Sequence, residues 1–286
     1  MKLLHENLPF TFGGVENDFA RAKAGVLQVP YDSTASYKTG MRHGPSAIID
    51  ASRNMELYDI EFGCDISQKV GFYTYDELHT DKGSPEKTVK IVEESVAEVL
   101  KAGKLPIVLG GEHSVSSGAI KACKEEYGQL SVLQIDAHAD MREEYEGTKY
   151  NHACVMRRIR GITSECVQVG VRSMSEEEAD YINEKKLGGS IFGPEFDAKK
   201  VAGMLKGNVY ITVDVDGFDP AFVPGVGTPE PNGISWEQAM ELFSLIKGKI
   251  VGFDVVELMP IAGQARSEFF CAKLAYKMAG YALLEK

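Results

Sequence analysis

The sequence predicts a three-layer α/β/α fold in which helices cover both faces of a central, mostly parallel sheet of eight strands. Short apolar runs, long enough for buried strands, alternate along the chain with longer amphipathic stretches that suit helices. No internal repeat or low-complexity linker divides the 286 residues. We therefore expect one domain that spans residues 1–286, since α/β architectures of this length often fold as a single unit.

Eight apolar runs mark the expected strands of this sheet. Helices are expected between them, for example over 85–102, which has a proline in its first turn and Gly103 at its end, and over 236–247, which ends before Gly248. The strands are expected to begin near Val26, Val70, Ile107, Val132, Val167, Ile191, Val209 and Ile250.

A last helix is expected over 267–285. Its large apolar residues are more numerous than one buried face requires, so we expect part of this helix to contact another subunit. These residues are Phe269, Phe270, Leu274, Tyr276, Met278 and Tyr281.

Composition and charge limit the partners of this chain. A formal charge of −11 disfavours nucleic acid, whose phosphates need a basic surface, and favours a small cationic ligand. No apolar run approaches the roughly 18 residues that span a bilayer, and residues 1–6 do not begin a signal peptide. Five cysteines form no CxxC pair, which argues against a disulfide framework and a thiolate zinc site. We expect a cytoplasmic protein that binds neither nucleic acid nor a membrane.

Side chains suited to metal binding follow three of the predicted strands. Because such sheets place their sites at the carboxyl ends of the strands, these residues are expected to converge. Those at a spacing of two residues point to one side of an extended chain. The candidates are His113 after the first of these strands, Asp136, His138 and Asp140 after the second, and Asp214 and Asp216 after the third.

The residue types in this set indicate a pair of hard or intermediate metal ions. Four carboxylates buried together without cations would repel one another strongly. Ligation by carboxylates and only two imidazoles suits Mn²⁺ better than a metal that prefers thiolates. Four carboxylates and two imidazoles are enough to serve two ions, as in two-metal hydrolases.

At this point the sequence resembles the ureohydrolases, the family that includes arginases and agmatinases. The resemblance covers most of the chain in order and in spacing. The opening segment 25–48 also matches, including Asp32, Gly40, Arg42, Gly44 and Pro45. The matching motifs are GGEHS (110–114), DAHAD (136–140), NHACVMRR (151–158), DVDGFDP (214–220) and VVELMP (255–260).

This resemblance implies a fold, a metal centre and a reaction. The family fold is one α/β/α domain with an eight-stranded parallel sheet, and its members usually form homotrimers or homohexamers. Two Mn²⁺ ions per subunit activate water, which attacks a guanidinium carbon and releases urea and an amine. The first ion would be held by His113, Asp136, Asp140 and Asp214, and the second by Asp136, His138, Asp214 and Asp216, with Asp136 and Asp214 as bridges.

The resemblance also implies roles for three residues around the reacting carbon. Asp140, besides binding metal, would pass a proton to the leaving amine. Glu257 would hydrogen-bond and orient the guanidinium, and His152 would shuttle protons and contact the substrate. A histidine at this position also suits the start of an exposed helix, which is the simpler interpretation of His152.

The tail of the substrate is predicted from two loops. The loop MREEYEGTKYN (141–151) is rich in glutamate, which favours a primary ammonium over a carboxylate. The segment GVGTPEPNG (225–233) resembles a loop of bacterial and archaeal agmatinases. We therefore expect agmatine to be hydrolysed to putrescine and urea. The candidate tail-binding residues are Glu143, Glu144, Glu146 and Glu230.

Other functions stay open at this stage. Arg142 and Lys149 lie in the same loop as the glutamates and would suit the carboxylate of guanidinobutyrate or another guanidino acid. Arginase and formiminoglutamase are further alternatives within the family. A metal-binding scaffold without catalysis is the alternative from another class.

Overall fold

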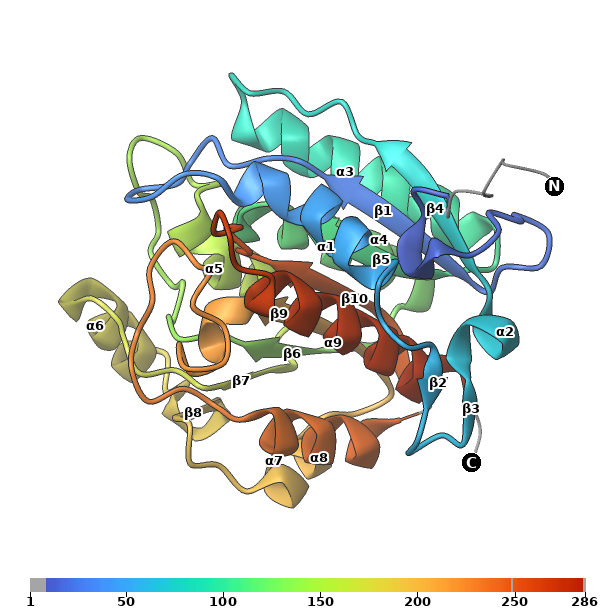
Figure 1. Cartoon of the computed structure of the whole chain (residues 1–286). Helices are drawn as coiled ribbons and strands as arrows, with labels where there is room; N and C mark the ends of the chain where they lie inside the picture. The colour runs from blue at the N-terminus through green and yellow to red at the C-terminus, as the bar shows by residue number, and fades with distance from the viewer. Residues whose placement is uncertain (1–8, 248, 285–286) are drawn as a thin grey trace, which may run out of the picture.

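The central sheet has eight strands in the order β4-β1-β5-β10-β9-β6-β7-β8, and every pair of neighbours is parallel (Figure 1). The computed structural model describes residues 9–247 and 249–284. The predicted fold class is confirmed. The strands are β1 (Ala24–Val29), β4 (Phe72–Glu77), β5 (Leu105–Gly110), β6 (Leu130–Ile135), β7 (Cys166–Val169), β8 (Ile191–Phe192), β9 (Asn208–Asp214) and β10 (Ile250–Val256).

Helices form a layer on each face of the sheet (Figure 1). Side chains alternate between the two faces along each strand, so in β5 Ile107 and Leu109 join one apolar core and Val108 joins the other. The first core is covered by α1 (Gly44–Ser52), α2 (Ile66–Val70), α7 (Ala198–Met204), α8 (Trp236–Ile246) and α9 (Arg266–Leu283). The second is covered by α3 (Pro85–Lys101), α4 (Ser116–Tyr127), α5 (Val155–Ile162) and α6 (Glu176–Glu184).

Short elements complete the fold. A two-stranded antiparallel hairpin, β2 with β3, lies outside the main sheet and was not predicted. The chain also forms single turns of 3₁₀ helix. Three of these turns contain a candidate ligand or His152. These elements are β2 (Tyr58–Asp59), β3 (Cys64–Asp65), η1 (Phe12–Gly14), η2 (Met41–His43), η3 (His113–Val115), η4 (His152–Cys154), η5 (Gly188–Ser190) and η6 (Val215–Gly217).

At the second predicted strand, the expected first residue belongs to a helix. Val70 ends α2, and β4 begins two residues later at Phe72. The Asp65 side chain accepts a hydrogen bond from the Gln68 backbone and caps this short helix, and Gly71, with φ 66°, then turns the chain into the strand. The apolar run predicted as a strand therefore contains the end of a helix as well as the start of a strand.

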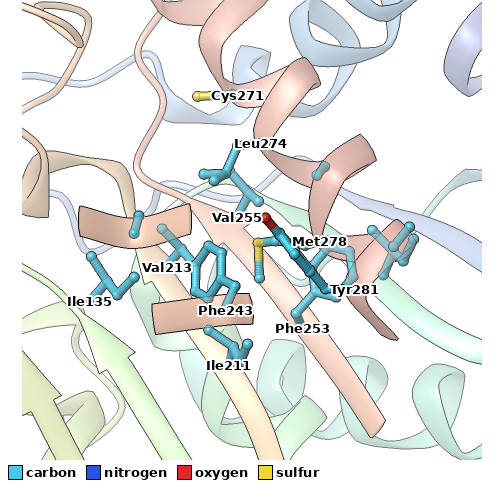
Figure 2. Packing of buried hydrophobic residues seen from close by; sticks show 14 of the residues in the cluster. Ile135, Ile211, Val213, Phe243, Phe253, Val255, Cys271, Leu274, Met278 and Tyr281 are labelled. Atoms are coloured by element: carbon cyan, nitrogen blue, oxygen red, sulfur yellow. The ribbon is translucent and has the colours of Figure 1, made fainter. Parts of the chain in front are cut away.

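Helix α9 is buried on nearly all sides. Figure 2 shows Phe243 of α8 and Leu274 of α9 over the strand residues Ile211, Val213 and Val255. Helix α9 also packs against α1 and α2. Of the six residues predicted to exceed one buried face, four are at most 1% exposed, Phe270 is half-buried and Phe269 is 41% exposed. Other elements of the same chain thus cover most of this apolar surface, and the expected oligomer stays a prediction.

Some expectations fall on residues that the structure does not describe. Residues 1–6, from which no signal peptide is expected, and residue 285, the expected end of the last helix, lie outside the described ranges. Within the described ranges, no helix combines the length and the apolar character needed to cross a bilayer.

Candidate metal centre and substrate pocket

The candidate ligands lie at the carboxyl ends of neighbouring strands in the middle of the sheet. His113 follows β5, Glu257 follows β10, Asp214 ends β9 and Asp136 follows β6. In the sheet order these four strands are consecutive, so segments far apart in the sequence meet at one edge. This is where open parallel sheets place their ligands.

A first cluster of possible ligand atoms surrounds His113. Its Nδ1 lies 3.1 Å from Asp136 Oδ2, 3.3 Å from Asp140 Oδ2 and 3.4 Å from Asp214 Oδ2. His113, Asp136 and Asp140 each offer an atom within 4.8 Å of the others, an arrangement that suits a metal ion. All four residues are buried.

The hydrogen bonds of His113 leave its Nδ1 free for a cation. The Thr212 hydroxyl donates its proton to Asp254 Oδ1, so Thr212 Oγ1 accepts from His113 Nε2, which is 2.9 Å away. His113 Nδ1 is buried and has no hydrogen-bond partner of its own. A lone pair aimed at carboxylates is repelled unless a cation lies between them, so the donor set fits a metal ion.

A second cluster shares Asp136 with the first. His138 Nδ1 lies 3.6 Å from Asp136 Oδ1 and 3.0 Å from Asp216 Oδ2, and these three residues form the other group suited to a metal. The two oxygens of Asp136 thus face different clusters. Asp214 Oδ1 accepts a hydrogen bond from the Asp216 backbone, which turns its Oδ2 towards His113.

The electrostatics of the clusters reflect an excess of buried negative charge. Burial, followed by the charge of Asp136, raises the pKa of Asp140 to about 7. Burial, with the charges of Asp216 and Asp136, raises the pKa of Asp214 well above its usual value. Burial alone would lower the pKa of His113, but the surrounding carboxylates, led by Asp136, raise it. These groups therefore retain protons where a metal would otherwise supply the positive charge.

Two residues of the site have backbone angles that are rare for their type. Asp140 has φ 53° and Glu257 has φ 66°, both in the left-handed region. Asp adopts this region more readily than Glu, and each such residue costs on the order of 1–3 kcal/mol. This conformation is held in place at Glu257 by two bonds, from its backbone nitrogen to Gly111 O at 2.7 Å and from the His113 nitrogen to Glu257 Oε1 at 2.6 Å.

Glycine at position 111 allows this packing. A Cβ there would lie 1.9 Å from the Tyr31 carbonyl oxygen, which accepts a hydrogen bond from the next residue, Glu112. The GGE motif thus brings the chain after β5 against the chain after β1, and it carries His113 into the first cluster.

A pocket of about 250 Å³ opens beside both clusters. His152 lines it, and burial lowers the pKa of this imidazole to about 4. The predicted start of a helix is also present, since His152 begins η4 and α5 follows, but the ring lies in the pocket wall and is only partly exposed. The acidic and basic lining residues include Asp140, Asp214, Asp216, Glu257, Glu178 and Arg142.

The glutamates predicted to bind the substrate tail do not line this pocket. Glu143 forms ion pairs with Lys149, Arg157 and Arg158, which hold its carboxylate at the base of the loop. Glu144 and Glu146 are exposed, and Glu230 is placed through its backbone carbonyl, which accepts a hydrogen bond from Arg172.

Glu178 is the pocket carboxylate that sequence analysis missed. It is 4% exposed, and its oxygens accept hydrogen bonds from the Met141 backbone and from the backbone and hydroxyl of Ser175. The signal was present as a capping box, because Ser175 is followed three residues later by a glutamate at the start of α6. This pattern predicts a helix start but does not indicate which cavity the helix faces.

Comparison with known proteins agrees with this geometry. The Arginase family matches residues 22–280. A Synechocystis sp. protein named N(1)-aminopropylagmatine ureohydrolase is 37% identical over 277 residues, 92% of this chain and 90% of that protein. An agmatinase from Halalkalibacterium halodurans is 33% identical over 250 residues, 85% of this chain and 86% of that protein. The crystal structure of agmatine ureohydrolase from Thermoplasma volcanium superposes with a TM-score of 0.83 at 34% identity, over 93% of both chains.

A parallel sheet that ends in two ligand clusters with a shared aspartate is an architecture suited to a binuclear metal hydrolase. The chain belongs to the Arginase family, whose members are hydrolases of this kind. The prediction of a ureohydrolase is therefore confirmed at the level of the family.

Proposed function

We propose that this chain, as one ureohydrolase domain over residues 1–286, uses two Mn²⁺ ions to cleave a guanidinium C–N bond. Agmatine, which would give putrescine and urea, is our first candidate substrate. The observation that carries the proposal is the pair of ligand clusters that share Asp136 beside a pocket lined by Glu257. A guanidino amine also suits the acidic character of the chain.

The donor set favours manganese. Carboxylate oxygens outnumber imidazoles and thiolates do not take part, which suits a hard or intermediate ion. When bound, such ions would activate water for attack on a guanidinium carbon. We assign His113, Asp136, Asp140 and Asp214 to one ion, and Asp136, His138, Asp214 and Asp216 to the other. Asp136 has an oxygen towards each cluster, as a bridging ligand requires.

Three residues would act on the substrate itself. Glu257 has one oxygen bound by the His113 backbone, which fixes the carboxylate so that it can orient a guanidinium. Burial and the charge of Glu112 raise the pKa of Glu257, so a neighbouring cation would stabilise its ionised form. Asp140 would pass a proton to the leaving amine. His152 is neutral near pH 7, since its pKa is lowered, and can accept a proton from the pocket.

The tail of the substrate is assigned to the Glu178 side of the pocket. Glu178 lines the pocket and belongs to neither metal cluster. It is also separate from Glu257, the residue proposed to orient the guanidinium. An ammonium group would be attracted to it. Arg142 also lines the pocket, with its guanidinium 4.6 Å from the centre of the Tyr145 ring, and is the group that would favour a guanidino acid instead.

N(1)-aminopropylagmatine is the second candidate substrate. The relatives of that name are 37% and 34% identical to this chain, whereas relatives named agmatinase are 33% and 32% identical. Both molecules carry the same guanidinium and an amine tail, so the metal centre does not distinguish them. The entrance of the pocket would distinguish the two substrates, because the longer tail must pass residues such as Met174, which is 45% exposed.

Urea release from a panel of substrates tests the proposal. Agmatine, N(1)-aminopropylagmatine, guanidinobutyrate and arginine are each supplied with Mn²⁺, Ni²⁺ or Zn²⁺, formiminoglutamate is assayed alongside through the formamide that its hydrolysis releases, and kcat/KM is compared. We expect an amine-tailed substrate with Mn²⁺ to be fastest. Faster turnover of arginine or a guanidino acid contradicts the tail assignment. Metal binding without urea release from any substrate favours a scaffold. A homotrimer or homohexamer and a cytoplasmic location stay predictions.

A further inference from the structure

The loop over residues 31–42 crosses the candidate site and is closed by its own charged groups. The Asp32 carboxylate accepts hydrogen bonds from the backbone of Gly40 and Arg42 and from the Arg42 side chain. Asp32 is 2% exposed, so the acceptor of these bonds is buried. The loop is therefore held in one shape before it reaches any other part of the site.

Glu112 attaches this loop to the chain after β5. Its carboxylate is fully buried and accepts hydrogen bonds from the Thr34 backbone at 2.6 Å, from the Thr34 hydroxyl at 2.5 Å and from the Ser114 hydroxyl at 2.5 Å. A hydroxyl has one proton, and that of Thr34 is used in the bond to Glu112. Thr34 Oγ1 can then only accept further hydrogen bonds.

His152 meets the loop at this acceptor. Its backbone nitrogen donates to Thr34 Oγ1 at 3.1 Å, and its Nδ1 lies 3.4 Å from the same oxygen. On the other side of the ring, Nε2 lies 3.4 Å from the hydroxyl of Ser36, which is exposed and free to rotate. The imidazole thus lies between an oxygen that accepts and a hydroxyl that can donate.

We propose that Glu112 and Thr34 are positioning residues that hold His152 in the tautomer with a proton on Nδ1 and a lone pair on Nε2. The proton on Nδ1 faces Thr34, and the lone pair faces the pocket beside Ser36. The opposite tautomer would place two lone pairs together, one on Nδ1 and one on Thr34 Oγ1. The choice of tautomer is a property of the folded chain, whereas its effect on catalysis rests on the proposed ureohydrolase activity.

This arrangement has a consequence for proton transfer. The nitrogen on the pocket side can take a proton from the reacting groups and return it, while the other nitrogen remains bonded to the loop. A change that removes the acceptor on Thr34 frees the ring to adopt either tautomer. The resulting loss of activity should lower kcat more than it raises KM, because substrate binding does not require the tautomer.

The direct test is nitrogen NMR of the imidazole in the full-length protein labelled with ¹⁵N-histidine, with Mg²⁺ in place of Mn²⁺ to avoid paramagnetic broadening. The His152 resonances are identified as those missing from the spectrum of His152→Asn. Couplings between the ring nitrogens and the carbon-bound ring protons then distinguish the tautomers. We expect Nδ1 to carry the proton in the parent chain and in Thr34→Ser, and a mixture in Thr34→Val. An Nε2-protonated ring in the parent chain would overturn the proposal.

Kinetics on the Mn²⁺ enzyme provide the second readout. Thr34→Val should lower kcat about tenfold or more with little change in KM, and Thr34→Ser should restore it. Thr39→Val, an exposed position in the same loop, is the matched control and should leave both constants unchanged. Thr34→Val with parent tautomer and parent kcat contradicts the proposal. The predicted tautomer in a chain that releases no urea supports this inference and contradicts the proposed function.

Discussion

Two groups of charged side chains differ in whether the chain supplies a lysine or arginine to pair with the carboxylates. At the end of α9, Lys277 pairs with Asp59 at 3.2 Å and with Glu61 at 2.6 Å, and the Tyr281 hydroxyl also donates to Glu61. At the carboxyl edge of the sheet, four carboxylates and two imidazoles meet, and among the residues described there the clusters contain neither lysine nor arginine. The chain thus supplies a lysine to the first group, whereas the second group suits cations from outside the chain.

The same contrast extends to the backbone. The residues of the Lys277 network have no left-handed φ value, whereas Asp140 and Glu257 in the candidate metal centre do. The Lys277 network joins α9 to the β2–β3 hairpin, so its bonds stabilise the fold. The sheet edge instead concentrates repulsion and strain, a combination found where residues are selected for function rather than for stability.

The largest expected effect comes from removal of the aspartate that both clusters share. Asp136→Asn should reduce urea release by at least about a thousandfold, because each ion loses a charged ligand. Metal content per chain should fall as well, because both clusters include Asp136. Asp50→Asn, at a side chain that is 65% exposed, is the control. Retained activity would contradict the shared-ligand assignment.

The Lys277 network should respond in the opposite way. Lys277→Met keeps the aliphatic stem but leaves Asp59 and Glu61 without their cation, and we expect the free energy of unfolding to fall by about 3 kcal/mol. Metal binding and kcat should not change. Lys101→Met removes an exposed pair with Glu98 and should leave the free energy of unfolding almost unchanged. Denaturant titration measures both, and a neutral Lys277→Met would show that the network is not a net stabiliser.

Much of the fold could be predicted because its signals are local. Buried parallel strands such as β5 and β9 are short apolar runs with clear ends, and α3 begins at a serine cap followed by proline. The β2–β3 hairpin has only two residues in each strand, too few for a pattern. The surroundings of α9 could not be predicted either, since an apolar helix gives no sign of whether its own chain or another subunit covers it.

The candidate site divides along the same line. The candidate metal ligands stand next to strand ends, where spacing brings His138 and Asp216 towards a common edge. The wall of the pocket depends on which loops fold over that edge. Glutamates near the motif, such as Glu143, are held by local cations, while Glu178 enters the pocket from the start of α6. Sequence distance from a motif is therefore a poor guide to the substrate tail.

Metal addition should stabilise the chain through the clusters and not through the Lys277 network. At a hundred times Kd, one Mn²⁺ site adds about 2.7 kcal/mol to the free energy of unfolding. Asp140, with a pKa of about 7, and both histidines, with raised pKa values, hold protons that the metal must displace. Protons compete more strongly as pH falls, so the increment should be larger at pH 8 than at pH 6.

Thermal unfolding with and without Mn²⁺ at the two pH values measures this increment. Lys277→Met should gain as much from the metal as the parent chain does, because its lost charge lies outside the clusters. Asp136→Asn should gain little. An increment that grows as the pH falls would contradict the assignment of these side chains as ligands.

The smallest expected effect concerns the substrate tail. Glu178→Gln should raise KM for agmatine about tenfold, roughly 1.4 kcal/mol, because it removes a negative charge from the pocket wall. The substitution also weakens the cap of α6, so a higher KM for agmatine could come from the lost charge or from damage to the fold. The KM for guanidinobutyrate separates the two causes, since loss of the charge alone should leave that KM unchanged or lower it. Glu143→Gln is the matched control outside the pocket. If Glu143→Gln raised KM for agmatine as much as Glu178→Gln does, the substrate tail would bind the loop glutamates instead.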